Sequence, residues 1–334
     1  FFSAETLPFT AKTVALTGKE IASNTLPDSG WEVITDDFNV LVLDHPVWNV
    51  DGGADQEATF ILTIDDRVRN ILGADPRGGR MVQPWLSEEK EPQGKLKLEL
   101  KYDFKCEQIP ITDCFLGIER PELYEIRING RELLQKDCGY WCDTSLRRLS
   151  LPNEYLCLGD NRIVITCQYH QFLPGLETVF LLGDFGTSSD GTTLLAAPKN
   201  LSFGDWCLQG FGNYSGNLSY RNSFLHQEKP GSSFVLEIPD WRGVALMIRL
   251  NNNAPHMLPW PPYSLNLDAE LKEGRNLLEI TVLGHRRNSH GPFHLNEKWP
   301  PWTGPNEFKR YETPERQLVP CGILKAPRII EIRQ

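Results

Sequence analysis

The chain has 334 residues, of which 40% are hydrophobic and 23% are charged, proportions that are typical of a globular protein. Its length is enough for two domains, each with its own core. A formal net charge of −10 and a pI near 5.3 argue against nucleic acid as a partner. No apolar run is long enough to span a membrane, and no signal peptide is recognisable, so a membrane partner is not expected either.

The first 30 residues are predicted to be a lead-in segment, because Pro8, Pro27 and Gly30 interrupt any regular element there. The segments that follow are short and apolar, and turn-forming residues separate them, which is the pattern of β-strands. Residues 65–79 are expected to hold no more than one helical turn. Strands are expected at Trp31–Ile34, Asn39–Asp44 and Thr59–Ile64.

The clearest predicted strand is Lys95–Phe104. Within it Leu96, Leu98 and Leu100 alternate with lysine and glutamate, which is the period of a strand with one buried face and one wet face. We therefore expect the leucines to lie in a core and the charged residues to face water.

A strand-and-turn pattern occurs twice in the chain. The segment Ile126–Gly130 returns in a looser form as Met247–Asn251. Each copy is followed by a tryptophan, a short extended segment, a glycine two residues before an asparagine, and a final strand. We interpret the repeat as one β-sandwich module used twice. The residues concerned are Trp141, Gly159 and Asn161 in the first copy and Trp260, Gly274 and Asn276 in the second.

The run Gly186–Thr193 is the richest in small and polar residues, and it is the predicted domain boundary. The first module would then span residues 31–188 and the second residues 189–334. No stretch has helical periodicity beyond about two turns. The sequence therefore predicts an all-β protein made of two tandem jelly-roll β-sandwich domains.

The first copy of the pattern, Ile128–Gly130 with Trp141 and Leu158–Asn161, resembles the sugar-binding, galactose-binding-like jelly roll of glycoside hydrolase family 2 and related enzymes. The second copy departs from it, with Asn252 where a glycine would stand. The resemblance covers most of residues 31–334 and implies a carbohydrate ligand. It brings no catalytic barrel, because strands do not alternate with long helices here. Three more segments resemble the C-terminal region of large bacterial, rhamnosidase-like glycosidases: Leu176–Gly186, Gly210–Asn217 and Arg287–His294.

The eight cysteines show no zinc-like spacing. Cys157 and Cys167 lie inside apolar strand patterns, where a free cysteine behaves as a small core residue. We expect reduced thiols, no cofactor and a cytoplasmic location. The even count leaves disulfides and secretion as an alternative, and the sequons at Asn200, Asn213 and Asn217 would matter only then.

The main candidate site is the polar loop after the strand that ends at Leu283. Guanidinium groups suit paired hydroxyls or a carboxylate, so a sugar, and an acidic sugar in particular, fits as a ligand. The alternatives are a loop whose polar groups bond its own backbone, and a metal site. A metal is not expected, because no carboxylate or cysteine is interleaved at ligand spacing. The candidate ligand-binding residues in this loop are Arg286, Arg287, Asn288, His290 and His294.

Two aromatic residues complete the predicted site. Trp206 and Tyr214 stand among glycines that let a ligand approach the backbone, and either ring would serve as a stacking surface. For catalysis the sequence offers only acid pairs without a distinguishing context, so no catalytic residue is assigned. These pairs are Asp36 with Asp37, Asp65 with Asp66, and Glu88 with Glu89.

The resulting hypothesis is a carbohydrate-binding, accessory β-sandwich region of a bacterial glycoside hydrolase. One alternative is that the chain belongs to a working glycoside hydrolase and contributes active-site loops. A catalytic domain elsewhere in the same polypeptide would then be a partner, and the abrupt start at Phe1 suggests a piece of a longer chain. The other alternative is a purely structural module that packs between domains.

Overall fold

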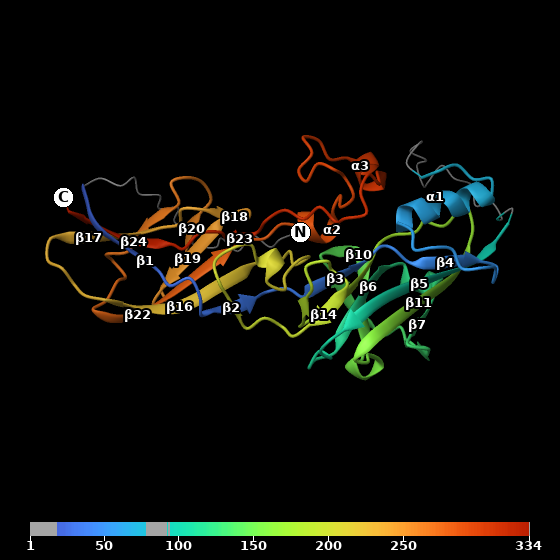
Figure 1. Cartoon of the computed structure of the whole chain (residues 1–334), viewed down its shortest axis with the longest axis horizontal. Coiled ribbons are helices and arrows are strands. Elements are labelled where there is room, and N and C mark those ends of the chain that lie inside the picture. Colours follow the sequence, from blue (N-terminus) through green and yellow to red (C-terminus); the bar gives the residue numbers. More distant parts are fainter. Residues whose placement is uncertain (1–18, 78–91, 93, 334) are drawn as a thin grey trace.

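The computed structural model describes residues 19–77, 92 and 94–333, and its regular elements are mostly strands. Figure 1 shows them gathered into two β-sandwiches that follow one another along the long axis of the molecule. The predicted all-β sandwich fold is therefore confirmed. None of the described helices is both long and apolar enough to cross a membrane.

The first sandwich, on the right in Figure 1, is built from two sheets. One sheet has the strand order β3 (Asn39–Leu43), β12 (Val179–Gly183), β6 (Cys114–Glu119), β10 (Asp143–Leu151) and β9 (Asp137–Trp141). The other has the order β13 (Gly186–Thr187), β14 (Thr193–Leu195), β5 (Leu96–Cys106), β11 (Gly159–Tyr169), β7 (Glu125–Ile128) and β8 (Arg131–Glu132), and β4 (Val47–Val50) pairs with β5.

Strand β5 shows how the sequence places the core of this sandwich. Leu98, Leu100, Tyr102 and Phe104 are 0–4% exposed, whereas the charged residues between them are exposed or half-buried. Successive side chains of a strand point to opposite faces, so the alternation buries one face against the opposite sheet. The prediction for this strand is confirmed at Leu98 and Leu100, and Leu96, at the first position of the strand, is half-buried.

The second sandwich also has two main sheets, with a core that contains Trp31 and Trp206. One sheet has the order β15 (Asn200–Leu201), β2 (Trp31–Thr35), β16 (Leu218–His226), β22 (Gly274–Val282), β19 (Leu246–Leu250) and β20 (His256–Leu258). The other has the order β1 (Lys19–Thr25), β24 (Arg328–Arg333), β17 (Ser232–Glu237) and β21 (Ser264–Asn266), and β18 (Trp241–Arg242) pairs separately with β23 (Gly322–Ile323).

The start of the described chain belongs to the second sandwich, which differs from the expected division at residue 31. Strand β2 lies between β15 and β16, and its Trp31 is 1% exposed in the second core. Strand β1 falls within the expected lead-in segment and pairs with β24 at the sheet edge. Residues 1–18 of that segment lie outside the described residues. An apolar pattern identifies a strand but not its sheet, which explains the difference.

The expected boundary at Gly186–Thr193 lies inside the first sandwich. Thr193 pairs with Lys105 of β5, and Leu194 is fully buried in the first core. The small polar residues form the turn between β13 and β14, where the Asp190 carboxylate accepts a hydrogen bond from the Thr192 amide at 3.1 Å. Small polar residues form tight turns as readily as linkers, so composition alone did not separate the two.

Residues Ile61–Ile71 form helix α1, so the prediction of a strand at Thr59–Ile64 was wrong. Ile61, Ile64 and Val68 are fully buried against the first core, at the three- and four-residue spacing of one helix face. The sequence offered only a short apolar run here, which a strand and a buried helix share. The remaining short helices are η2 (Pro121–Leu123), η3 (Asn153–Tyr155), η4 (Trp206–Leu208), α2 (Arg287–His290) and α3 (Pro305–Lys309).

Residues 284–320, here called the C-terminal excursion, leave the second sandwich after β22 and return to it at β23. Between these strands the excursion packs against the first sandwich. Figure 1 shows that its helix α3 lies on the same side of the first sandwich as α1. Lys309 of α3 places its Nζ 3.6 Å from the Asp66 carboxylate of α1. Phe293 packs with Val40 and Phe180 on the face of the β3–β12 sheet that is turned away from the first core. The excursion therefore covers the outside of the first sandwich.

Candidate functional site

The two aromatic residues of the predicted site are core residues of the second sandwich. Trp206 is 0% exposed and Tyr214 is 1% exposed, and their rings lie 6.1 Å apart in an edge-on contact. The Tyr214 hydroxyl donates a hydrogen bond to the Asn217 carbonyl at 2.6 Å. Neither ring presents a face to solvent in this structure, so neither offers a stacking surface for a sugar.

The first part of the predicted loop is tied to other protein groups. Arg286 places Nη2 3.0 Å from the Asp37 carboxylate, and its guanidinium lies over the Trp141 ring at 5.2 Å. Arg287 donates from Nη2 to the Lys298 carbonyl at 2.7 Å, and burial lowers the pKa of its guanidinium. Asn288 is fully buried and binds the backbone of Val319 through both its amide nitrogen and its oxygen. The Arg286 contacts hold the excursion to residues outside it, whereas the Arg287 and Asn288 contacts join parts of the excursion to one another.

The two predicted histidines lie in different surroundings. His290 stacks on the Trp141 ring at 5.4 Å, and its Nε2 lies 3.4 Å from the Cys142 sulfur. Burial lowers the pKa of His290 from 6.5 to about 4, so at neutral pH the ring is uncharged. His294 is buried beside Asp44 at the end of β3, 3.4 Å from Nε2 to the carboxylate. The structure therefore does not gather the seven predicted residues around one opening.

The acid pairs of the sequence are largely structural. Asp36 accepts from the Asn217 amide, Asp37 from the Trp141 indole, and Asp65 from the Tyr169 hydroxyl and the Arg77 guanidinium. Asp65 is 1% exposed, which explains why it needs two charge-compensating donors. Glu88 and Glu89 lie outside the described residues.

A cleft of about 660 Å³ opens between the first sandwich and the excursion. Its size lies in the range of sites for small organic ligands, about 300–1,000 Å³. One wall carries the ring of Phe60 and, from α3, the ring of Phe308, which is 36% exposed. Polar lining residues come from three strands or their ends, from α2 and α3 and from the segment after α1: Glu119, Asp143, Ser145, Glu177, Thr178, Ser289, His290, Lys309 and Arg77.

The carboxylates in the cleft differ in their partners. Glu177 lies 2.6 Å from Nη1 of Arg77, and Asp143 accepts from both the amide and the hydroxyl of Ser145. Among the described residues, the Glu119 carboxylate has neither a hydrogen-bonding partner nor an ion pair. Burial raises the pKa of Glu119, and the negative charges of Glu177 and Asp143 add to the effect. The Ser145 hydrogen bonds lower the pKa of Asp143. The pKa values of these two acids are thus shifted in opposite directions.

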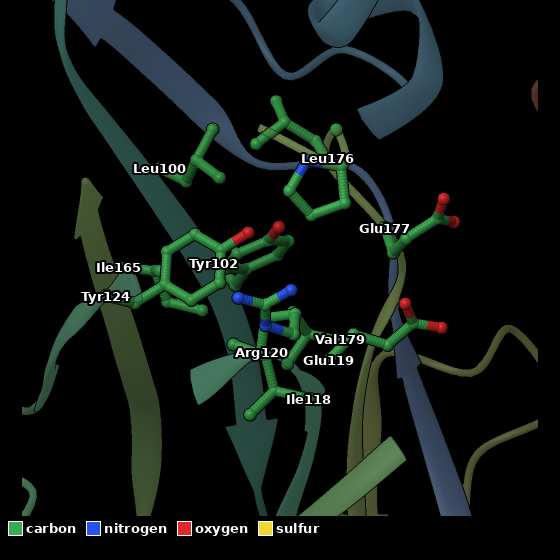
Figure 2. A pocket seen from close by; sticks show the side chains of 12 residues that line it. Leu100, Tyr102, Ile118, Glu119, Arg120, Tyr124, Ile165, Leu176, Glu177 and Val179 are labelled. Atoms are coloured by element: carbon green, nitrogen blue, oxygen red, sulfur yellow. The ribbon is translucent and has the colours of Figure 1, made fainter. Parts of the chain in front are cut away.

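A smaller pocket of about 20 Å³ lies next to the cleft and shares Glu119 and Glu177 with it. Figure 2 shows these two carboxylates on one side, Tyr102 and Tyr124 on the other, and the Arg120 guanidinium near the tyrosines. The Tyr102 hydroxyl is buried and has no hydrogen-bond partner among the described residues. A space of this volume holds one water molecule or one hydroxyl group of a ligand.

Of the residues predicted from the sequence, His290 lines this cleft, but the sequence reasoning missed the acids in it. Glu119 ends β6, Asp143 begins β10 and Glu177 precedes β12, so the three acids come from neighbouring strands of one sheet that are far apart in the chain. Their grouping depends on the strand order, which a single sequence does not show. The only signal was that each acid stands at the end of an apolar strand, where side chains of adjacent strands meet.

No family model matches the chain, and no curated protein matches it. Among solved structures it is distantly similar to chains of glycoside hydrolases. A rhamnosidase from Novosphingobium sp. PP1Y has a TM-score of 0.31 and 16% identity over 72% of this chain and 22% of that one. An α-L-rhamnosidase from Streptomyces avermitilis has a TM-score of 0.25 and 12% identity over 58% of this chain and 22% of that one. A glycosyl hydrolase family 2 member from Bacteroides cellulosilyticus has a TM-score of 0.25 and 12% identity over 74% of this chain and 32% of that one.

The chain spans about a fifth to a third of the length of these enzymes. At such TM-scores the similarity carries no argument about activity, which must come from the cleft.

Proposed function

We propose that the chain is a carbohydrate-binding β-sandwich region and that the cleft between the first sandwich and the excursion is its binding site. The observation that carries the proposal is the Glu119 carboxylate, which faces an apolar-walled cleft without a hydrogen-bonding partner among the described residues. Leaving a partly buried acceptor unpaired costs free energy, and a ligand hydroxyl would restore the missing hydrogen bond. The ring of Phe308, which is 36% exposed, supplies apolar surface for the carbon face of a sugar ring, whereas Phe60 is 6% exposed and adds little.

The charges favour a neutral sugar over the acidic sugar expected from the sequence. Arg286 is paired with Asp37. Arg287 donates from Nη2 to the Lys298 carbonyl and keeps Nε and Nη1 buried without a partner among the described residues, and neither arginine lines the cleft. In the cleft, Arg77 is paired with Asp65 and Glu177 and Lys309 lies 3.6 Å from Asp66, so Glu119 and Asp143 have no ion pair among the described residues. A ligand that donates hydrogen bonds fits these acceptors, whereas a carboxylate would be repelled.

The pair of Glu119 and Asp143 also supports a second candidate function, hydrolysis of a glycosidic bond. A raised pKa on one acid and a lowered pKa on its neighbour is the pattern of a general acid beside an ionised base or nucleophile. Release of reducing sugar from the ligand identified in the binding assay tests this function. Loss of that release in both Glu119→Gln and Asp143→Asn would support hydrolysis, and binding without release would leave the binding function alone.

The binding proposal is tested with an array of neutral and uronate-containing oligosaccharides, followed by calorimetry with the strongest ligand. We expect binding to neutral sugars with a dissociation constant on the order of 0.1–1 mM. Glu119→Gln and Phe308→Ala are expected to weaken it about tenfold, because each removes one principal contact.

Matched controls are Glu132→Gln on the exposed surface of β8 and Phe172→Ala, whose ring is 48% exposed outside the cleft. Both are expected to bind like the unaltered protein. Failure of the unaltered protein to bind any neutral sugar, or equal weakening by the controls, would contradict the proposal.

A further inference from the structure

We propose that Asp44, His45 and His294 form a binding site for one divalent transition-metal ion. Each residue offers one ligand atom, and the three atoms all lie within 4.8 Å of one another. Two imidazoles and a carboxylate are ligands that zinc and related ions accept in proteins. The site is separate from the carbohydrate proposal, since none of the three residues lines the cleft, although Phe60, which does, packs against the His294 ring at 5.0 Å.

The three residues are brought together by the excursion. Asp44 and His45 directly follow β3 of the first sandwich, and Asp44 is 0% exposed. His294 arrives from the other sandwich, 250 positions later in the chain, and is 2% exposed. The ligand set therefore assembles only when the excursion is docked on the first sandwich.

The hydrogen bonds of His294 carry the inference. Its Nδ1 lies 3.0 Å from the Thr313 carbonyl, which only accepts, so Nδ1 must carry a proton, and in the proposed metal-binding form the ring carries no second one. Its Nε2 then presents a lone pair to the Asp44 carboxylate oxygen Oδ2, 3.4 Å away. Two acceptors facing each other in a buried site repel unless a cation lies between them. A histidine that ligates through Nε2 while its Nδ1 proton binds a backbone carbonyl is the usual arrangement at metal sites.

His45 completes the set from the solvent side. Its Nδ1 lies 2.8 Å from Asp44 Oδ1, and its Nε2 lies 3.1 Å from the Tyr311 hydroxyl. When an ion binds, the neutral ring must carry its one proton on Nε2: Nδ1 releases a proton to solvent, Nε2 takes one up from solvent, the Nδ1 lone pair becomes the ligand, and the Nε2–H group donates a hydrogen bond to the Tyr311 oxygen. His45 is 25% exposed and Tyr311 is 43% exposed, so an ion has access from this side.

The pairing of Arg316 with Asp44 and the ligand types of the site limit which ions can bind. Its Nη2 lies 2.6 Å from Asp44 Oδ1 and neutralises the carboxylate, while Oδ2 stays directed at His294. Magnesium and calcium require several anionic or neutral oxygen ligands, which this site lacks. Imidazole nitrogen favours zinc, cobalt, nickel and copper. We therefore expect binding of Zn²⁺ and Co²⁺ and no binding of Mg²⁺ or Ca²⁺.

The rival explanation is a second proton on His294, which would donate to Asp44 without any metal. Two substitutions separate the explanations. His294→Asn places an amide where Nδ1 stood, so it keeps a donor for the Thr313 carbonyl and removes the Nε2 ligand. His294→Gln places an amide N–H where Nε2 stood, so it replaces the proposed proton-mediated bond to Asp44 but not the metal ligand.

The test is equilibrium dialysis of the full chain against Zn²⁺, Co²⁺, Mg²⁺ and Ca²⁺ in separate arms, with metal counted by mass spectrometry and thermal unfolding measured with and without Zn²⁺. We expect one Zn²⁺ or Co²⁺ per chain and a higher unfolding temperature with Zn²⁺. Both His294 variants are expected to bind the ion about tenfold more weakly or not at all. His226→Asn, far from the cluster in β16, is expected to retain it.

Two cysteine and histidine groups are competing sites for a soft ion: the exposed Cys142 beside His290, and the buried Cys321 beside Cys207 and His285. Uptake that is lost in Cys142→Ser and kept in His294→Asn would overturn the proposal. The absence of stoichiometric uptake by the unaltered chain would also overturn it. A third contrary result would be that His294→Gln is as stable as the unaltered chain and that Zn²⁺ changes the unfolding temperature of neither protein.

Discussion

The two sandwiches share one corner almost atom for atom. In the first, the Asn129 amide donates to Asn161 Oδ1 at 2.9 Å and its own oxygen accepts from the Arg162 amide at 2.9 Å. In the second, Asn251 donates to Asn276 Oδ1 at 2.7 Å and accepts from the Leu277 amide at 2.9 Å. The repeat detected in the sequence is therefore a repeated structural corner.

The positive φ angles of the corner also repeat. Asn129 and Asn251 have φ of 49° and 53°, and the glycines before the final strands, Gly159 and Gly274, have φ of 85° and 86°. These values lie in the left-handed region, which asparagine and glycine adopt more readily than other residues. Asn252, at φ 62°, takes the place of Gly130 without changing the turn.

What differs between the sandwiches is what is attached to them. The first carries α1 between β4 and β5, and the second sends out the excursion between β22 and β23. The proposed sugar cleft and the proposed metal site both lie where these additions meet. The tryptophans of the repeat differ in the same way, since Trp141 is 4% exposed under the excursion while Trp260 is 61% exposed. The repeated residues thus form the corners of the two sandwiches. The polar groups of the two proposed sites lie in or beside the segments that are not repeated.

The largest expected effect concerns the division of the chain. A fragment of residues 189–334 lacks β2, which lies between β15 and β16, and lacks Trp31 from the second core. We expect this fragment to be insoluble or to lack a cooperative unfolding transition. Circular dichroism and thermal unfolding of the fragment, with and without a synthetic peptide of residues 19–37, would measure this. A soluble fragment that unfolds cooperatively without the peptide would show that the second sandwich does not need β2.

The next effect compares the two cores. Leu98 and Leu278 are both 0% exposed, on β5 and β22 respectively. Leu→Ala at either position should lower the free energy of unfolding by about 2–5 kcal/mol, because each leaves a cavity in a packed core. Urea unfolding measures both. A single transition in each variant would show that the halves unfold together, and a transition shifted for one half alone would show independent domains.

The sequence predicted the features of the fold that are local properties of the backbone. Period-two alternation identified β5, and the Asn and Gly residues at positive φ identified the corners, because both are local properties of the backbone. The helix α1 was missed, since a short buried run has no distinguishing period. The sequence did not show which sheet contains β2, because the order of strands in a sheet depends on residues far apart in the chain.

The candidate site was harder to predict for the same reason. The loop of Arg286 to His294 was predicted as a ligand site, and in the structure its polar groups bind Asp37, Val319 and Asp44 from other parts of the chain. Glu119 was not considered, because nothing next to it in sequence marks it. Partners that arrive from other strands determine whether a polar side chain is structural or open to a ligand.

The third effect concerns the junction between the halves. Burial lowers the pKa of His290 from 6.5 to about 4, so below pH 6.5 the unfolded chain takes up a proton that the folded chain does not. The stability linked to His290 is therefore complete above pH 6.5 and is lost as the pH falls toward 4. The loss amounts to at most about 3 kcal/mol.

Urea unfolding between pH 7.5 and pH 4.5 compares the unaltered protein with His290→Gln. The variant should lose less stability over this range, because its side chain does not titrate. His226→Gln in β16 serves as the control and should follow the unaltered protein. Equal pH dependence in His290→Gln and the unaltered protein would contradict a buried, neutral His290 at the junction.

The smallest effect tests the shared corner itself. Asn161 and Asn276 are 2% and 0% exposed, and each donates to two backbone carbonyls and accepts from one backbone amide within its turn. Replacing either by alanine leaves buried backbone groups unpaired, at a cost of about 1–3 kcal/mol. Because the bonding is the same, the two costs should agree within about 0.5 kcal/mol when measured by urea unfolding. A larger loss of unfolding free energy for Asn161→Ala than for Asn276→Ala would mean that α1 and the excursion strain the first sandwich more than the second. The two corners would then share their geometry but not their contribution to stability.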